Sequence, residues 1–246
     1  MRHTILQKIK KNIFHPKLGE ILMFHRITYT RNEIVTQHND YTLEVTPDFL
    51  EKTILKYKNA GYQFVNLYQV QKMLKRHSFF RKRFVCFTFD DGFRDNFELA
   101  YPIFKRHNCP FTIYVSIGFV DGTASVWWEN ALQDTQKDLP MAREQLKILA
   151  NEPLCTIGSH TVSHKRLTEI PENEQFNEIL ESKKLLEEIT GKEVVHFSYP
   201  GGFYNQQITK IVEKCGYRTA TRNFGDTVRR GDNLFELNRK FVIEPL

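Results

Sequence analysis

Residues 84–92 read FVCFTFDDG, and the nearly continuous apolar run over 84–89 predicts a strand that a parallel sheet buries on both faces. Two adjacent carboxylates, Asp90 and Asp91, end this strand, and Gly92 follows them. Neighbouring side chains of an extended chain point to opposite faces, but a chain that turns at a glycine can direct them differently. One carboxylate could then bind a metal while the other moves a proton. Alone, the same three residues also fit an ordinary surface turn that caps a helix.

Outward from this strand, short apolar runs alternate with amphipathic helical segments. The predicted strands are 20–27, 63–67, 84–89, 111–116, 155–158, 194–199, 217–221 and 241–243. The predicted helices are 46–61, 68–76, 94–107, 141–151, 171–190 and 206–215. This alternation implies parallel strands joined by right-handed crossovers. Because the sequence has no dinucleotide-type glycine-rich turn, we favour an α/β fold of the distorted (β/α) barrel kind over an open sheet. In such barrels the functional site lies at the carboxyl ends of the strands.

The chain of 246 residues has no internal repeat, low-complexity tract or flexible linker. Its length fits one large barrel. We expect a basic N-terminal segment over residues 1–19 and a single domain over residues 20–246. No stretch approaches the roughly 18 apolar residues of a transmembrane helix.

The formal net charge is +6, and the N-terminus, MRHTILQKIKKNIFHPKLG, is basic. It lacks the apolar core of a signal peptide, so we expect a surface helix, with a weak membrane-surface anchor as the alternative. The four cysteines are widely spaced, which favours free thiols in a reducing compartment. We therefore expect a cytoplasmic protein, with the inner membrane face as the alternative location. No motif supports nucleic-acid binding.

A second polar cluster follows the short strand over 155–158. Residues 158–164 read GSHTVSH, which places His160 and His164 four residues apart. A catalytic divalent metal needs a few protein ligands and an open position, and two imidazoles with Asp91 would provide this. An isolated histidine pair of this spacing is more often two surface histidines. Here the Asp90–Asp91 pair at the end of another predicted strand favours the metal interpretation.

Two further segments end apolar strands. Residues 197–202 read FSYPGG, and a sharp bend there could expose backbone amides that suit an oxyanion, or form an ordinary loop. His25 follows Met23 and Phe24 at the end of the first strand. It is either a core histidine or a general acid that faces the same mouth of the barrel.

Together these residues resemble the polysaccharide deacetylase family, the carbohydrate esterases of family 4 that carry the NodB homology domain. TFDDG matches the first motif of the family, SHTVSH the second and FSYPGG the third, and the match extends from about Glu20 to Phe241. The resemblance implies a distorted (β/α)₇ barrel of the NodB-like type, with one catalytic domain over 20–246. It implies metal ligands at Asp91, His160 and His164, a catalytic base at Asp90, and an oxyanion donor at the Tyr199 amide.

The chain also departs from the common pattern. Many members carry a general-acid histidine in a C-terminal Leu-x-His motif, but residues 237–241 read LNRKF. Circularly permuted members place this histidine near the N-terminus, and His25 is similar to that form, which acts on poly-N-acetylglucosamine-like polysaccharides. The arginine that many members have in the third motif is not apparent. Trp127 and Trp128 resemble a loop of the family and could stack on sugar rings or cover the barrel.

We therefore expect a metal-dependent hydrolase that removes N-acetyl groups from an amino sugar or polysaccharide, in surface polysaccharide biosynthesis. The bond cleaved would be a carbon–nitrogen bond other than a peptide bond. We expect Zn²⁺ first, although Co²⁺, Ni²⁺ or Fe²⁺ suit the same ligands. The alternatives are an O-acetyl esterase that uses the same site, a non-catalytic glycan-binding protein, and a binder of membranes or nucleic acid driven by the positive charge.

Overall fold

The computed structural model describes residues 16–29, 43–76, 82–126, 140–223, 225 and 227–245. The segment that opens the sequence argument forms β5 (Phe84–Phe89), which is buried along its whole length as its apolar run predicts. It pairs in parallel with β1 (Lys17–Phe24) on one side and β6 (Phe111–Val115) on the other. The sheet continues in parallel through β7 (Cys155–Ser159), β8 (His196–Ser198) and β9 (Thr219–Arg222).

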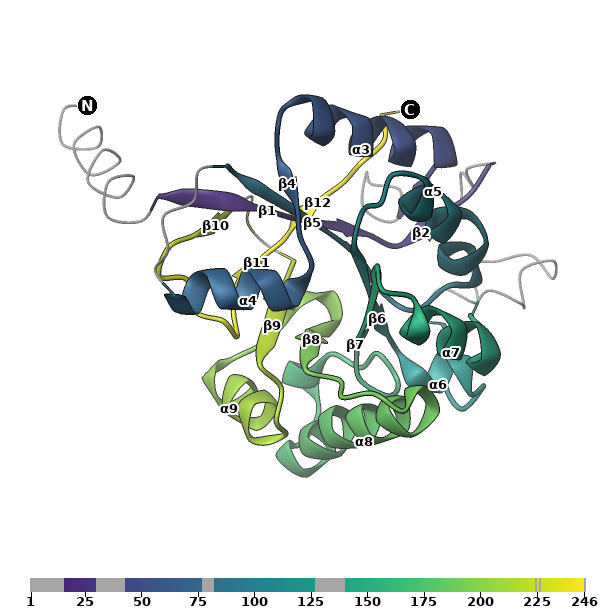
Figure 1. The fold of residues 1–246 in the computed structure, drawn as a ribbon. Helices are drawn as coiled ribbons and strands as arrows, with labels where there is room; N and C mark the ends of the chain where they lie inside the picture. Colours follow the sequence, from purple (N-terminus) through teal and green to yellow (C-terminus); the bar gives the residue numbers. More distant parts are fainter. Residues whose placement is uncertain are drawn as a thin grey trace.

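The C-terminal segment joins the two ends of this sheet. β11 (Leu237–Asn238) pairs in parallel with β9, and β12 (Lys240–Phe241) pairs in parallel with β1. Because only Arg239 separates these short strands, the chain steps from one end of the sheet to the other and nearly closes a barrel (Figure 1). The predicted distorted barrel is confirmed. Short pairings at its rim, β10 (Val228–Arg229) beside β1 and β4 (Gln63–Phe64) beside β5, complete the sheet.

Several predicted boundaries shift by one to three residues, and two predicted elements are interrupted in the structure. The strand predicted over 20–27 breaks at His25, and the next two residues form β2 (Arg26–Ile27), which pairs with β3 (Glu44–Val45) in a separate small sheet. This break places His25 at the carboxyl end of β1. The helix predicted over 94–107 contains a π-helical turn, Asn96–Ala100, before α5 (Tyr101–Arg106). Such turns are often found near functional sites.

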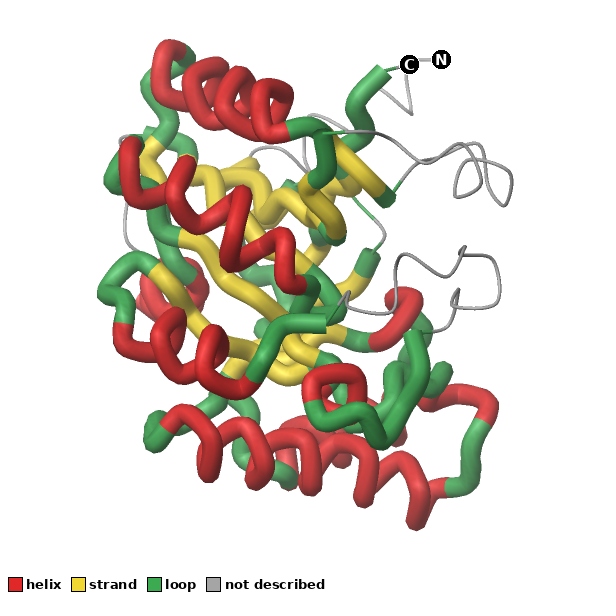
Figure 2. Tube along the Cα trace, turned by 90° about the vertical axis from the view of Figure 1, so that its right-hand side faces the viewer, coloured by secondary structure: helices red, strands yellow, loops and turns green. Residues whose placement is uncertain are grey.

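Helices lie outside the strands, as Figures 1 and 2 show. The described α-helices are α3 (Pro47–Asn59), α4 (Leu67–Arg76), α5, α6 (Ile117–Val120), α7 (Arg143–Asn151), α8 (Glu172–Thr190) and α9 (Gln206–Lys214). Local sequence sets their ends: Thr46 and Asn205 accept hydrogen bonds at the N-termini of α3 and α9, and left-handed Gly191 ends α8. None of the described helices has the length and apolar character needed to span a membrane.

The strands bury two apolar layers. On one face, Phe87 and Phe89 of β5 pack edge-on against Phe104 of α5. On the other face, Cys86 and Tyr114 belong to a second cluster, which includes apolar side chains of α4. All four cysteines are free, as expected from their spacing. The basic segment predicted over residues 1–19 lies outside the described residues up to residue 15, and its last three residues belong to β1. Trp127 and Trp128 also lie outside the described residues.

His196 is fully buried on β8, and its Nδ1 lies 2.8 Å from the hydroxyl of Thr219. Burial lowers the pKa of His196 to about 3, from 6.5 in the unfolded chain. Between these values only the unfolded state takes up the proton, so the folded protein loses stability as the pH falls below about 6.5. We expect the free energy of unfolding of metal-free wild type to fall, relative to that of His196→Gln, by about 2 kcal/mol from pH 7 to pH 5. Urea unfolding of both proteins at both pH values measures this, and parallel pH dependences would contradict it.

Candidate metal centre

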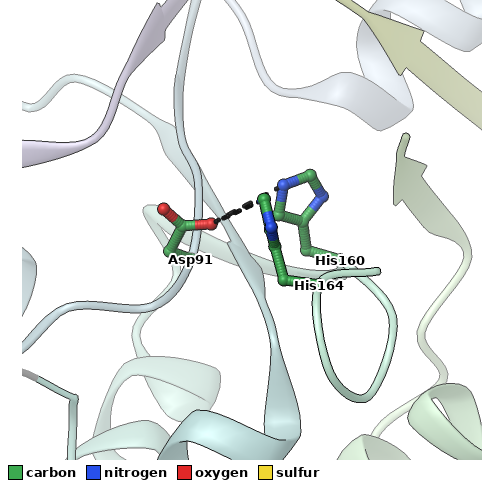
Figure 3. A group of neighbouring side chains, drawn as sticks. All are labelled: Asp91, His160 and His164. Carbon is green, nitrogen blue, oxygen red and sulfur yellow. Dashed lines mark ion pairs between the residues drawn. The ribbon is translucent and has the colours of Figure 1, made fainter. Parts of the chain in front are cut away.

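Three of the predicted site residues converge at the carboxyl ends of β5 and β7. One ligand atom from each of Asp91, His160 and His164 lies within 4.8 Å of the others (Figure 3). Asp91 Oδ1 lies 3.7 Å from His160 Nε2 and 3.4 Å from His164 Nε2. β5 and β7 are parallel strands of one sheet, with β6 between them. Their carboxyl ends therefore lie at the same edge of the sheet, although the residues are far apart in sequence.

The backbone at this edge is unusual. Among the described residues, four that are not glycine have a positive φ, and three of them lie here: Asp91 at 72°, Thr161 at 68° and His164 at 57°. Such conformations cost about 1 kcal/mol or more each and tend to gather at functional sites. Gly92, with φ 86°, continues the turn. The chain therefore turns at Asp91 itself as well as at Gly92, which lets Asp90 and Asp91 take different partners.

A hydrogen bond fixes which nitrogen of His160 faces the cluster. His160 Nδ1 lies 2.8 Å from the backbone carbonyl oxygen of Ser198. A carbonyl oxygen only accepts, so Nδ1 carries the hydrogen when the ring is neutral. Burial lowers the pKa of His160, which favours this neutral form. The lone pair then lies on Nε2, the nitrogen nearer Asp91, as a metal ligand requires.

Asp91 supplies the test of whether a cation fits. Both of its carboxylate oxygens are buried without a hydrogen-bond partner. Burial, reinforced by the charge of Asp90, raises the pKa of Asp91 well above its usual range. A buried carboxylate without a donor is unfavourable unless a cation or a proton satisfies it. Two atoms that bind one zinc ion, each at about 2 Å, lie at most about 4 Å apart, and Asp91 Oδ1 meets this limit with both histidines. The donor set therefore fits a divalent metal.

Asp90 is held by an arginine that the sequence analysis missed. Arg239 Nη1 donates to Asp90 Oδ1 and Nη2 to Oδ2, both at 2.6 Å, and Arg239 is fully buried. The same guanidinium donates to Ser198 Oγ at 2.9 Å and to Asn223 Oδ1 at 2.7 Å. Burial would raise the pKa of Asp90, but Arg239 and then His160 lower it, and the net result lies below the usual range. Asp90 is therefore ionised at neutral pH.

Arg239 accounts for the arginine that is absent from the third motif itself. Arg239 reaches Ser198 of FSYPGG from the segment over 237–241, which lacks the expected histidine. The arginine therefore lies between β11 and β12, the two short strands that close the barrel. In the sequence LNRKF nothing distinguishes a buried arginine from a solvated one.

His25 lies on the Asp90 side of the cluster. Its Nε2 is 4.0 Å from Asp90 Oδ2, and its carbonyl oxygen accepts a hydrogen bond of 2.8 Å from Asn96, in the π-helical turn. Burial lowers the pKa of His25 to about 4, although Asp90 partly offsets this effect. His25 is therefore neutral at pH 7 in the metal-free protein. The structure brings it to the mouth of the barrel, where the sequence analysis expected it.

The Tyr199 amide already has a hydrogen-bond partner in the sheet. Its N–H donates to the carbonyl oxygen of Thr221 at 3.1 Å, within the pairing of β8 with β9. A backbone N–H is a single donor, so an oxyanion would have to replace this carbonyl oxygen, and the role expected for the Tyr199 amide stays a prediction. Pro200 has no N–H, and Gly201, left-handed at φ 63°, carries the first amide beyond these two residues.

Comparisons with known proteins agree with this geometry. A family model described as Polysaccharide deacetylase matches residues 78–220, more than half of the chain. YxkH of Bacillus subtilis (strain 168), whose name places it in that family, is 28% identical over 219 residues, which cover 89% of this chain and 69% of YxkH.

Solved structures show the same fold. The Streptococcus pyogenes deacetylase PplD in complex with acetate is 25% identical, with a TM-score of 0.77 over 92% of each chain. IcaB from Ammonifex degensii has a TM-score of 0.75 at 21% identity, also over 92% of each chain, and supports the fold alone.

Proposed function

The chain belongs to the polysaccharide deacetylase family, and on this premise we propose that it is a metal-dependent hydrolase that removes N-acetyl groups from an amino sugar or polysaccharide. One observation carries the proposal. The carboxylate of Asp91 is buried, has no hydrogen-bond partner and faces His160 and His164, and the ionised Asp90 lies beside this cluster. We assign catalysis to a single domain over residues 20–246.

The residues of the chain divide the chemistry between them. A divalent metal bound by Asp91, His160 and His164 would supply Lewis acidity toward the acetamide carbonyl and toward water. Asp90, kept ionised by Arg239, accepts a proton from the attacking water. Asp90, Asp91 and His160 follow the carboxyl ends of β5 and β7, and Arg239 lies at the barrel closure, so the sheet fixes the relative positions of these four residues.

The leaving group needs a proton, and we assign its delivery to His25. Since burial keeps His25 neutral at pH 7, we propose that the proton taken by Asp90 passes through His25 Nε2, 4.0 Å away, to the departing amine. Acetate and a free amino sugar result. Because the Tyr199 amide bonds within the sheet, we assign the oxyanion donor to Gly201, whose amide follows Pro200.

The proposal specifies the acyl group that is removed, acetyl, more closely than the glycan that carries it. The permuted position of His25 favours a poly-N-acetylglucosamine-like substrate over other acetylated glycans. An O-acetyl ester passes through a similar oxyanion, so acetate release from N-acetylated and O-acetylated sugars must be measured side by side. Faster release from the O-acetylated sugar would replace the proposed N-deacetylase with an esterase.

The first test is metal content, because it does not depend on knowing the substrate. Tag-free protein incubated with zinc and then dialysed should retain about one ion per chain, since three ligands converge on one position. His164→Ala should bind zinc more than about 100-fold more weakly, because losing a direct ligand should cost at least as much as losing an outer-shell partner. Elemental analysis and competition with a chromophoric chelator measure both.

The matched control is His107→Ala, which removes a histidine paired with Glu51 outside the cluster. This variant should retain zinc as the wild type does. A wild-type protein without zinc after this treatment would refute the metal site. Equal loss in both variants would show that the effect is not specific to the cluster.

A further inference from the structure

One face of α8 carries a polar stripe along the segment that holds the two histidines. Gln175, Glu178 and Ser182 are spaced as neighbours on one side of a helix, and all three are buried. The helix runs beside β7 (Figure 1). Each of the three side chains binds a different part of the chain between the end of β7 and the start of α8.

The three contacts follow the order of the segment. Ser182 Oγ lies 2.7 Å from the hydroxyl of Ser159, the residue before His160. Gln175 Nε2 donates to the carbonyl oxygens of Leu167 and Ile170, each at 2.9 Å, beyond His164. Glu178 binds Val162 and Ser163, in the three-residue stretch between the two histidines. α8 thus binds this segment at three places: before His160, between His160 and His164, and after His164.

Glu178 makes the central contact. Its Oε2 accepts the backbone N–H groups of Val162 and Ser163, each at 2.9 Å, and its Oε1 accepts the hydroxyl of Ser163. No neutral side chain accepts at two atoms in this way, whereas a carboxylate does. The residues that flank these two amides, Thr161 and His164, are both left-handed.

This contact bears on the geometry of the metal ligands. His164 follows Ser163 directly, and its own N–H donates to Thr161 Oγ1 at 3.0 Å. The backbone over residues 161–164 therefore decides where His164 Nε2 lies relative to Asp91 Oδ1, 3.4 Å away in this structure. Without an acceptor at position 178, two partly buried N–H groups would lose their partner and the left-handed conformation its support.

We propose that Glu178 is a positioning residue for His164, and that it sets the affinity and coordination geometry of the metal site without touching the metal. This inference rests on the metal site proposed above. It predicts a graded loss of affinity that follows the number of hydrogen bonds removed. Outer-shell partners of metal ligands typically contribute about 10- to 100-fold in affinity.

Three variants separate the contacts. Glu178→Leu removes every acceptor and should weaken zinc binding about 10- to 100-fold. Ser163→Ala removes only the hydroxyl contact and should have a smaller effect. Glu178→Gln retains an acceptor for the two amides, and its NH₂ can face the Ser163 oxygen, so its affinity should recover to within about threefold of the wild type.

The matched control is Glu181→Leu, the same change on the same helix at an exposed residue that pairs with Lys184. Zinc affinity is measured by chelator competition at one pH, and the visible absorption of the Co²⁺-loaded protein reports ligand geometry. Circular dichroism and urea unfolding of the metal-free variants report folding. We expect Glu178→Leu to change the cobalt spectrum, and Glu178→Gln and Glu181→Leu to leave it as in the wild type.

Several outcomes would overturn the inference. If Glu178→Leu does not fold, the other two variants decide. Wild-type affinity and spectrum in Ser163→Ala contradict the inference, and so does unrecovered affinity in Glu178→Gln. A folded Glu178→Leu with wild-type zinc affinity and cobalt spectrum also contradicts it, as does an equal loss in Glu181→Leu. A wild-type protein that binds no metal refutes the metal site itself, a result distinct from a metal site that is indifferent to Glu178.

Discussion

Asp90→Asn should lower kcat by about 10²- to 10⁴-fold while the protein retains its zinc, because the amide cannot accept the proton that a general base removes from water. Asp90 belongs to a different set of contacts from the metal ligands: its two oxygens receive the Arg239 fork, whereas Asp91 faces the two histidines. Loss of activity without loss of metal would therefore separate the base from the ligands. The measurements are acetate release and elemental analysis on the same preparation.

The control must also break a carboxylate–arginine pair. Asp121 receives Arg143 through two hydrogen bonds of 2.6 and 2.8 Å, away from the cluster, and Asp121→Asn should keep both zinc and activity. An active Asp90→Asn enzyme would show that another group is the base. Because Asp90 has a pKa below its usual range, its protonation should not limit the wild-type rate above about pH 4.

Much of the site could be predicted because each cluster follows an apolar run. Parallel strands bring their carboxyl ends to one edge, so Asp91 and His160 could be placed together although 68 residues of sequence separate them. The apolar run before His25 likewise placed this residue near the end of the first strand. The strand predicted there ran three residues past the end of β1, because the chain breaks at His25 and the next two residues pair with another short strand that has no pattern of its own.

Arg239 could not be placed in this way. Its partner, Asp90, is 149 positions away, and the two meet only because β11 and β12 join the ends of the sheet. Each of these strands has two residues, which is too short for any periodicity. Hydrophobic patterning describes which face of a strand is buried, but it does not say where a sheet closes on itself.

The Tyr199 amide has a hydrogen-bond partner that could not be predicted either, for a different physical reason. Its position after an apolar strand made it look free, but whether a strand-end amide is free depends on how far the neighbouring strand extends. Here β9 continues to Arg222, and the carbonyl oxygen of Thr221 accepts the Tyr199 N–H. Such pairing is a property of two segments, and neither shows it alone.

Arg239→Met should have the largest effect on stability, a loss of about 3–5 kcal/mol, because it leaves the carboxylate of Asp90 buried without its partner. It should also change the pH dependence of activity. Burial raises the pKa of Asp90 and the Arg239 charge lowers it, so without the arginine the pKa should rise above its usual range. The folded variant should therefore gain activity as the pH increases, over a range in which the wild-type rate is independent of Asp90. Urea unfolding and the pH dependence of kcat/KM measure the two effects.

Arg239→Lys separates charge from geometry. A lysine keeps the positive charge, so the pKa of Asp90 should stay low, but its three donors cannot reproduce a planar fork that also reaches Ser198 and Asn223. For Arg239→Lys we expect kcat to fall without the change in pH dependence that we expect for Arg239→Met. The control is Arg218→Met, which breaks an exposed pair with Glu193 and should cost about 1 kcal/mol or less. A methionine variant with wild-type stability and pH profile would mean that Asp90 is kept ionised by something other than Arg239, and the bound metal would then be the first candidate for that charge.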